Sequence, residues 1–401
     1  MQRTQIAIVG AGPTGLLLGA LLHRAGISNV IVERCRAEDI LARSQACVLE
    51  DDSIAVLNAA GLSLGAQALR QDSLLLSVDG RSHRVELARL TAGRGLTQCS
   101  QTELTRSLMR ARAAAGMHTI YEAQQVSLHG FLGADAPLLR YRKQDQDHEI
   151  RCDYIAGCDG FHGVSRASVP PDAYRCYERL YPFGWLGVLA ECPAAAPELL
   201  LAQHPRGFAL SVMAGPQRSH SYIQCSLSDR LTQWSDTQFW AELRRRLGPD
   251  LGSTLPVAPA LDMSITPLRS FVLEPVRFGR LLLAGDAAHV VPPTGAKGLN
   301  LAATDTQELS EALAQACRGD HAEQGLNNYS ERALRRTWRA ERFSWALTRL
   351  LHSFPDQNSF DQRIQQAELE HLLDSRAAQT VLAESFVGQP ASAGGAPGVF
   401  T

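Results

Sequence analysis

Residues 5–33 contain the pattern that most restricts what this 401-residue chain can fold into. A short apolar run at 5–9 (QIAIV) is followed by the glycine-rich turn GAGPTG at 10–15, and then by a segment with helical apolar spacing that ends at Gly26. A second apolar run, VIV at 30–32, leads directly into Glu33. This order predicts a βαβ unit with the spacing GxGxxG at its first turn.

Each glycine of this turn, and the acid after the second strand, has a separate physical role. Gly10 permits the tight turn, Gly12 lets the backbone come close to a pyrophosphate, and Gly15 lets helix and strand pack closely. Glu33, 21 residues after Gly12, stands where a carboxylate accepts hydrogen bonds from ribose hydroxyls. We therefore predict an ADP-containing cofactor here. The alternative is a glycine-rich turn that binds nothing.

A second glycine-rich loop lies far along the chain, at Gly285–Asn300 (GDAAHVVPPTGAKGLN). It follows the apolar run LLLA at 281–284 and precedes a helical pattern, so it predicts a strand, a loop and a helix N-terminus in that order. The N–H groups and the dipole of a helix N-terminus favour a phosphate or a polar chain. An ordinary βα loop is the alternative, because Gly and Pro punctuate loops everywhere.

The remaining patterns divide the chain into parts. Residues 174–275 carry much of the aromatic content and several β-like runs, which predicts an antiparallel sheet inserted between two halves of the cofactor domain. The predicted fold class is therefore α/β, as an α+β composite with a Rossmann-like domain. Its predicted parts are a first cofactor-domain segment at 1–173, the sheet domain at 174–275, a second cofactor-domain segment with an interface helix at 276–352, C-terminal helices at 353–387 and a disordered tail at 388–401.

Composition excludes several classes of protein. A net charge of −2 gives no electrostatic reason to expect nucleic-acid binding, and no apolar stretch is long enough to span a bilayer. Nine cysteines without a CxxC spacing predict neither a zinc site nor a disulfide framework, and we expect no metal. Without a signal-peptide pattern, we expect a cytoplasmic protein. Cys47 is expected to be a small packing residue rather than a reactive thiol.

Together with both glycine-rich loops, several further stretches carry a resemblance to a known family. They are AGCDGFHGVSR at 156–166, YPFGWLG at 181–187, PLRSF at 267–271 and AERFSW at 340–345. The chain resembles the single-component FAD-dependent aromatic hydroxylases, and within them the 4-hydroxybenzoate 3-monooxygenase branch, over nearly all of its length except the tail. The resemblance implies FAD, NADPH or NADH as reductant, O₂, and a small aromatic substrate that receives one oxygen from a flavin C4a-hydroperoxide. It also implies a homodimer, which the residues themselves do not specify.

The resemblance implies which residues surround the cofactors. Glu33 would bind the ribose, Arg43 and Gln101 would lie near the pyrophosphate and ribityl chain, and Asp286 would hold the ribityl hydroxyls. The full set implied for FAD is Gly10, Gly12, Gly15, Glu33, Arg34, Arg43, Gln101, Asp159, Asp286, Lys297, Gly298, Leu299 and Asn300. His162 and Arg269 match positions that meet the nicotinamide cofactor. For His162 the alternative is a local hydrogen-bonding role in its loop.

The resemblance also implies a substrate pocket, and here the sequence departs from the family. Pro293 would present its backbone carbonyl to the reacting hydroxyl, with Tyr222 and His220 as further catalytic residues. The family holds a carboxylate with Ser, Arg and Tyr, and here these positions are Val212, Ala214 and Tyr222. Leu201 and Phe386 replace two tyrosines of a proton relay, His220 replaces an Arg, and Gln45 replaces an Arg implicated in NADPH binding. The implied pocket comprises Trp185, Leu201, Leu210, Val212, Ala214, Tyr222, Pro293 and Phe386.

These departures predict a paralogue that hydroxylates an amino- or hydroxy-aromatic compound other than a benzoate, because an unpaired buried carboxylate is costly. One alternative is a true 4-hydroxybenzoate 3-monooxygenase with a diverged pocket. A flavin-linked oxidase or dehydrogenase and a flavin-binding protein without turnover are two others.

Overall fold

A computed structural model describes residues 2–42, 46–65, 68–133, 136–319 and 322–388. The predicted βαβ unit forms as expected, with β2 at Ile6–Val9, α1 at Pro13–Arg24 and β3 at Asn29–Val32. Pro13 occupies the first position of α1, where its missing N–H costs no hydrogen bond. Every residue of β2 is buried, which fits a central strand of a parallel sheet.

The cofactor domain is built on a six-stranded sheet with the strand order β19-β20-β13-β2-β3-β9. Its strands from β20 to β9 run parallel, and β19 is the antiparallel edge. The further strands of this sheet are β9 (Thr119–Ile120), β13 (Tyr154–Gly157), β19 (Arg277–Phe278) and β20 (Leu281–Leu283). Strands from residues 6–157 and from residues 277–283 therefore share one sheet.

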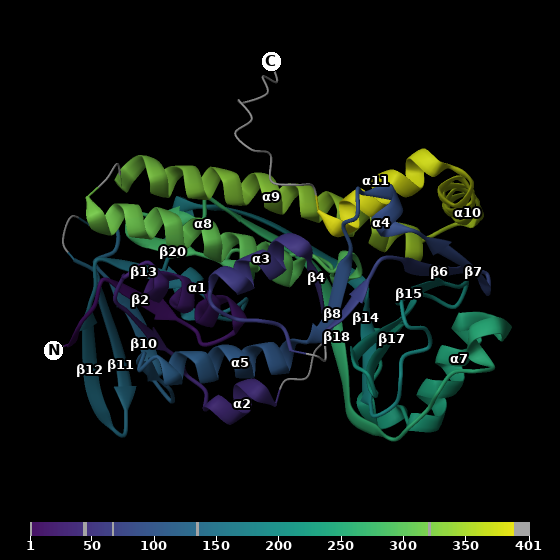
Figure 1. Ribbon diagram of the computed structural model, residues 1–401, viewed down its shortest axis with the longest axis horizontal. Helices are drawn as coiled ribbons and strands as arrows, with labels where there is room; N and C mark the ends of the chain where they lie inside the picture. The colour runs from purple at the N-terminus through teal and green to yellow at the C-terminus, as the bar shows by residue number, and fades with distance from the viewer. Residues whose placement is uncertain (1, 43–45, 66–67, 134–135, 320–321, 389–401) are drawn as a thin grey trace, which may run out of the picture.

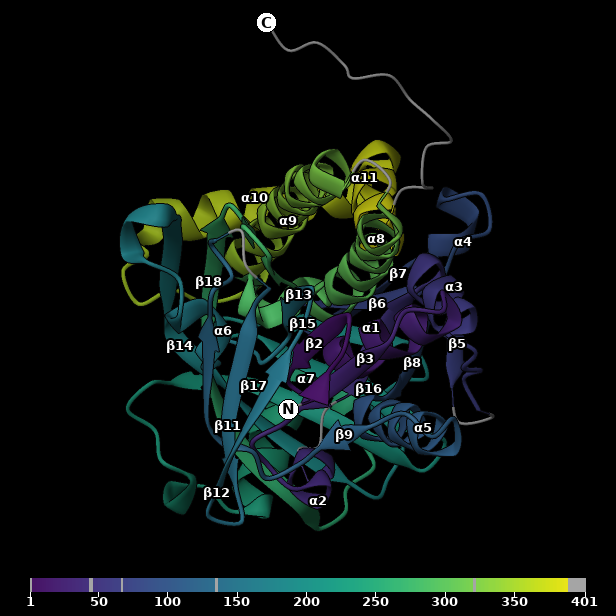
Figure 2. The same ribbon diagram turned by 90° about the vertical axis from the view of Figure 1, so that its left-hand side faces the viewer.

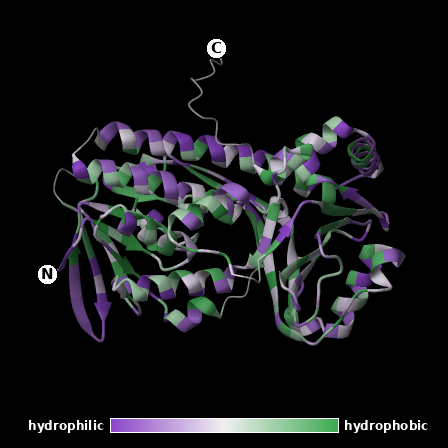
Figure 3. Cartoon of the chain, in the orientation of Figure 1, coloured by the Kyte–Doolittle hydropathy of each residue, from purple (hydrophilic) through white to green (hydrophobic). Residues whose placement is uncertain are grey.

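Two smaller sheets flank it. A four-stranded sheet contains β1 (Gln2–Arg3), β10 (Gln124–His129), β11 (Leu138–Lys143) and β12 (Gln146–Arg151). A three-stranded antiparallel sheet contains β4 (Ala46–Glu50), β5 (Leu69–Gln71) and β8 (Leu96–Ser100). The β11–β12 hairpin is hydrophilic at one end of the molecule, whereas hydrophobic residues concentrate on the inner strands (Figure 3).

The largest sheet has eight strands in the order β21-β18-β14-β17-β16-β15-β6-β7. They are β6 (Leu74–Val78), β7 (Arg81–Val85), β14 (Arg175–Ala190), β15 (Leu199–Gln203), β16 (Ala209–Gly215), β17 (Arg218–Ser226), β18 (Ala260–Glu274) and β21 (His289–Val290). The inserted antiparallel sheet is therefore present, but it extends beyond residues 174–275 because β6 pairs in parallel with β15 and β21 pairs with β18.

Helices cover these sheets on several sides. In Figure 1, α8 and α9 run side by side along the top of the molecule, and Figure 2 shows the same pair above the sheets from the end. The helices are α1, α2 (Ala37–Leu41), α3 (Asp51–Ala59), α4 (Leu87–Leu90), α5 (Gln101–Ala114), α6 (Val164–Ala167), α7 (Asp236–Gly252), α8 (Gly298–Arg318), α9 (Ala322–Leu351), α10 (Ser359–Asp374) and α11 (Arg376–Val387). None of the helices described is long and apolar enough to cross a membrane.

A layer of aromatic rings lies between the large sheet and the C-terminal helices. The Trp185 Nε1–H donates a hydrogen bond of 2.8 Å to His352 Nε2, and His352 Nδ1 contacts the Thr348 carbonyl at 3.0 Å. The His352 ring stacks on Phe208 and Phe183, with ring centroids 4.4 Å and 4.8 Å apart. Burial lowers the pKa of His352 to about 3, so this histidine is neutral at neutral pH.

His352 should make the fold acid-sensitive. The unfolded chain takes up a proton at this histidine below about pH 6.5, whereas the folded chain does so only near pH 3, so stability falls as pH decreases between these values. The loss is up to about 1.4 kcal/mol per pH unit. His352→Gln should flatten the dependence of the urea-unfolding midpoint on pH between about 7 and about 4.5. His118→Gln, at an exposed histidine, is the control and should keep the wild-type slope; parallel curves for all three proteins would contradict this account.

Candidate active site

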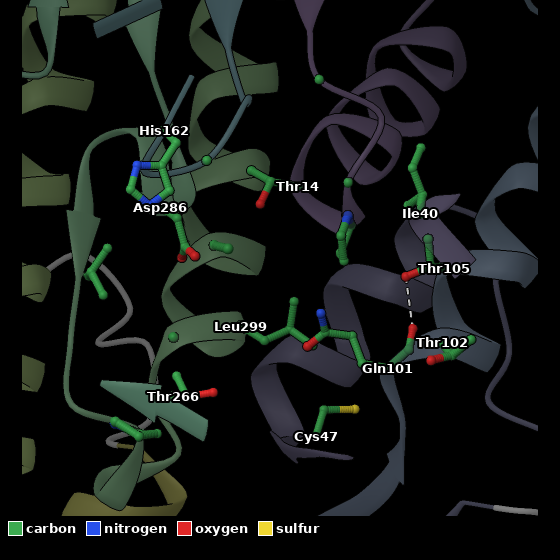
Figure 4. Close-up of a pocket in the computed structure, with 18 of the residues that line it drawn as sticks. Thr14, Ile40, Cys47, Gln101, Thr102, Thr105, His162, Thr266, Asp286 and Leu299 are labelled. Atoms are coloured by element: carbon green, nitrogen blue, oxygen red, sulfur yellow. Dashed lines mark hydrogen bonds between the residues drawn. The ribbon is translucent and has the colours of Figure 1, made fainter. Parts of the chain in front are cut away.

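One elongated cavity of about 960 Å³ runs between the two glycine-rich loops and the large sheet. Its glycine-loop end is lined by residues of the first βαβ unit, α5 and the 158–164 segment. Its large-sheet end is lined by strands β14 to β18 together with Pro293, Thr294 and Ala296. Figure 4 shows Ile40, Gln101 and Thr105 on one side of the cavity and His162, Asp286 and Thr266 on the other.

The three glycines of the first turn differ in what surrounds them. A side-chain carbon on Gly15 would lie 2.0 Å from the Gly10 carbonyl oxygen, so helix and turn approach too closely for any other residue. Gly10 has φ of +102° and packs on Cys158 in the same way. A side-chain carbon on Gly12, in contrast, meets nothing within 4 Å and would point into empty space. That open space beside a helix N-terminus fits a pyrophosphate.

Glu33 is held rigidly at the same end. Its Oε2 accepts a 2.7 Å hydrogen bond from the Ala11 N–H, and its Oε1 accepts one of 2.8 Å from the Cys35 N–H. Glu33 and its neighbour Arg34 both line the cavity. A carboxylate oxygen has two lone pairs, so each oxygen can still accept a bond from a ribose hydroxyl.

Gln101 lines the cavity from the first turn of α5, which Ser100 caps by accepting a hydrogen bond from the Glu103 N–H. The predicted partner Arg43, like Gln45, lies outside the described residues.

On the opposite wall, Asp159 lines the cavity and accepts a 2.8 Å hydrogen bond from the Ser165 N–H at the start of α6. Burial raises the pKa of Asp159, and the Ser165 N–H partly offsets this.

The two residues predicted to meet the nicotinamide cofactor take different positions. His162 lines the cavity, next to Asp286 in the view of Figure 4. Arg269 does not line it. Its guanidinium lies over the Phe161 ring, 4.1 Å from the centroid, and pairs with Glu178 at 3.4 Å. Because Phe161 also touches His162, Arg269 stands behind the cavity wall rather than in it.

The loop at Gly285–Asn300 is anchored from behind by one buried carboxylate. Asp305 accepts hydrogen bonds from the Gly285 N–H at 3.2 Å and from His289 at 2.7 Å, and its other oxygen pairs with Arg336 at 3.3 Å. Burial alone would lower the pKa of His289, but the Asp305 charge and hydrogen bond outweigh it and the pKa is raised. These bonds leave the neighbouring Asp286 side chain exposed to the cavity.

The end of this loop contributes uncharged residues to the cavity. Gly298 and Leu299, at the N-terminus of α8, line it. The Lys297 ammonium points away, to Glu50 at 2.5 Å and to the Phe386 carbonyl at 2.8 Å. The Asn300 side chain bonds to the backbone of β4 and to Ser53. Both side chains therefore fasten α8 to its neighbours.

At the large-sheet end, six of the eight predicted pocket residues line the cavity. They are Trp185, Leu201, Leu210, Val212, Tyr222 and Pro293. Ala214 and Phe386 do not line it. Ala214 is buried near the end of β16, and Phe386, in the last turn of α11, packs edge-on against Phe343 of α9. For these two residues the predicted pocket position is corrected to the protein core.

The lining residues that were not predicted include three polar ones on β18, namely Asp262, Ser264 and Thr266. They alternate along the strand, so their side chains lie on one face of the sheet. The sequence signal that could have identified them is the recurrence of polar residues at every second position, in a strand that pairs with β14.

Two polar groups at the large-sheet end, His220 and Tyr222, are held neutral. Burial, and after it the charge of Arg218, lowers the pKa of His220 to about 4. Burial raises the pKa of Tyr222, whose hydroxyl lies 3.3 Å from His220 Nδ1. Among the described residues that line this end, none is a lysine or an arginine, and Asp262 is the acidic one. This part of the cavity therefore offers no cation to a carboxylate.

Comparison with known proteins agrees with this geometry. A family model described as an FAD binding domain matches residues 3–344. The p-hydroxybenzoate hydroxylase of Acinetobacter baylyi is 50% identical over 390 residues, covering 97% of this chain and 96% of that protein. The chain belongs to the FAD-dependent aromatic hydroxylases, which are oxidoreductases that use NAD(P)H and O₂.

Two solved structures share the fold. The p-nitrophenol 4-monooxygenase of Pseudomonas putida has a TM-score of 0.81 at 16% identity and covers 97% of this chain and 99% of its own. The Pseudomonas aeruginosa protein PqsL, in complex with 2-aminobenzoylacetate, has a TM-score of 0.77 at 21% identity and covers 92% of this chain and 100% of its own.

The contrast between Gly12 and Gly15 yields a test of FAD binding. Gly12→Ala should fold with a nearly unchanged melting temperature without FAD, since its new methyl group meets no atom, but it should bind FAD more weakly. Gly15→Ala should lose about 1–3 kcal/mol of stability because of the clash with the Gly10 carbonyl. Thermal unfolding and FAD titration of the apoproteins measure both effects. Wild-type FAD affinity in Gly12→Ala would argue against a pyrophosphate at this turn.

Proposed function

We propose that this chain hydroxylates a small aromatic amine or phenol that carries no carboxylate, with NADPH or NADH as reductant. The observation that carries this proposal is the absence of lysine and arginine among the described residues that line the large-sheet end. The cytoplasm as its location and a homodimer as its assembly stay predictions.

The energetic argument rests on the cost of burying a charge. A carboxylate transferred into this end would lose its hydration. Its possible hydrogen-bond donors among the described lining residues are uncharged, namely His220, Tyr222 and the hydroxyls of Ser264 and Thr266. Leaving such a charge unpaired costs roughly 3–5 kcal/mol. Asp262 adds repulsion, since it is the acidic residue on this surface. A neutral ring with an amino or hydroxyl group avoids both the burial of an unpaired charge and the repulsion by Asp262.

The residues have distinct tasks in this proposal. FAD, when bound, supplies the oxygen-transfer chemistry. Leu201, Leu210 and Val212 form an apolar surface that excludes water from the ring. Pro293 is preceded by Pro292, and the two rings restrict the backbone that carries the Pro293 carbonyl. This carbonyl accepts a 2.9 Å hydrogen bond from the Ala296 N–H. The second lone pair of that carbonyl can accept a hydrogen bond from an amino or hydroxyl group of the substrate.

A second candidate substrate is 4-hydroxybenzoate. The 50% identity to a p-hydroxybenzoate hydroxylase over almost the whole chain favours it. The apolar Val212 and Leu201 at the large-sheet end count against it, because neither can hold a carboxylate or relay a proton. A flavin-binding protein without turnover is the remaining alternative, and measurable NAD(P)H consumption with a product would exclude it.

Two ligands of nearly equal shape separate the candidates. 4-Hydroxybenzamide should bind the holoenzyme about 100-fold more tightly than 4-hydroxybenzoate, or better, because it lacks the charge that costs roughly 3 kcal/mol to bury. Perturbation of the flavin absorbance measures both affinities. 4-Aminobenzamide then compares an amino with a hydroxyl group on the same ring.

Turnover gives the second readout. With NADPH or NADH and O₂, mass analysis should find a neutral substrate enlarged by one oxygen atom. Tight binding of 4-hydroxybenzoate with efficient formation of 3,4-dihydroxybenzoate would overturn the proposal and establish the second candidate.

A further inference from the structure

Two cysteines face each other in the wall of the FAD cavity. Cys47 on β4 and Cys99 on β8 are directly opposed partners in an antiparallel pair. Both side chains are buried, and their Sγ atoms lie 2.6 Å apart. Cys47 lines the cavity and is drawn in Figure 4 below Gln101.

The backbone geometry allows these residues to be cross-linked. Directly opposed residues in an antiparallel pair have Cβ atoms about 4.5–5.5 Å apart. A disulfide needs about 3.5–4.5 Å between Cβ atoms, so a small approach of the two strands is sufficient. Other buried cysteines have different partners: Cys152 contacts the Pro137 carbonyl at 3.7 Å, and Cys192 contacts Ser219 at 3.9 Å.

A cross-link between these two cysteines would affect the cavity because of where the pair lies. Cys99 is separated from Gln101, a cavity residue at the start of α5, only by Ser100. On the other side, β4 is fastened to α8 through Asn300, which bonds to the Val48 carbonyl and the Glu50 N–H. A bond between Cys47 and Cys99 would therefore join the α5 and α8 sides of the cavity through β4.

We propose that Cys47 and Cys99 form a reversible disulfide in the wall of the FAD cavity, with hydrogen peroxide as the oxidant. One sulfur attacks a peroxide oxygen, the O–O bond breaks, and water leaves as a sulfenic acid forms. The other sulfur attacks the sulfenic sulfur, the S–S bond forms, and a second water leaves. The two thiols are oxidised by two electrons, and one peroxide is reduced to two waters.

The environment of the pair sets its rate of oxidation. The contact with Cys99, and after it burial, raises the pKa of the Cys47 thiol well above its usual range. Only the thiolate is an effective nucleophile, so oxidation is slow at neutral pH and accelerates as pH rises. The disulfide therefore records sustained exposure to peroxide rather than brief exposure.

The cross-link can be read directly because trypsin places each cysteine in its own peptide. Cleavage at arginine yields peptides 44–70 and 95–106, and each contains one cysteine. Reduced holoenzyme is treated with graded peroxide at about pH 7 and about pH 8.5, alkylated and digested without reductant. The expected product is the linked pair of peptides, formed faster at the higher pH and released by dithiothreitol. Absence of this pair, or its appearance only in urea-unfolded protein, would overturn the proposal.

Two variants separate the pair from general oxidation. Cys99→Ser should give no linked peptide and should leave Cys47 as a species that a sulfenic-acid reagent labels. Cys152→Ser, at a buried cysteine that contacts a carbonyl, should form the linked peptide at the wild-type rate. A linked-peptide yield in Cys152→Ser as low as in Cys99→Ser would also overturn the assignment.

The effect on the cavity has its own readout. The oxidised wild-type holoenzyme should release FAD at least about threefold more slowly than the reduced holoenzyme. The reason is that the cross-link restricts the separation of the two strands. Peroxide should leave the FAD release rate of Cys99→Ser unchanged. Equal rates for oxidised and reduced wild type would refute the role of the disulfide in the cavity wall.

Discussion

The cavity depends on a single carboxylate that water does not reach. Asp305 ties the N–H of Gly285 to His289 and Arg336, and so joins the second glycine-rich loop to α8 and α9. A buried carboxylate left without these partners would be strongly destabilising, so the bonds must form together. The turn at Gly285 is then fixed in direction, and the exposed Asp286 side chain next to it lines the cavity. The position of this loop in the cavity wall is therefore determined by Asp305, which does not itself line the cavity.

Features that depend on local sequence could be predicted, whereas features that depend on tertiary packing could not. The βαβ unit was predictable because its signals are local: apolar runs, glycines at fixed spacing and one acid after β3. Ala214 and Phe386 were placed in the pocket by position along the chain. In the structure the cavity ends before Ala214, and α11 docks Phe386 into the core. Such limits follow from tertiary packing, which no local pattern records.

The bounds of the large sheet also depend on contacts that are distant in sequence. The sheet predicted at 174–275 also includes residues 74–85, because β6 pairs in parallel with β15 across more than a hundred residues of chain. A pairing so distant in sequence leaves no periodic signal. The period of two that places Asp262 and Ser264 on the cavity face was present in the sequence, but its meaning depends on which face of β18 is covered.

The two ends of the cavity differ in how their charges are arranged. At the glycine-loop end, backbone N–H groups hold Glu33 in a fixed orientation. At the large-sheet end, burial keeps His220 and Tyr222 neutral, and the neutral His352 fixes Trp185 from behind. Interactions between charges are strong where water is excluded, so a single guanidinium can change the affinity for a carboxylate more than many changed apolar contacts. Family membership therefore determines the class of reaction, whereas we expect the few polar groups of the large sheet to select which ring can receive the oxygen.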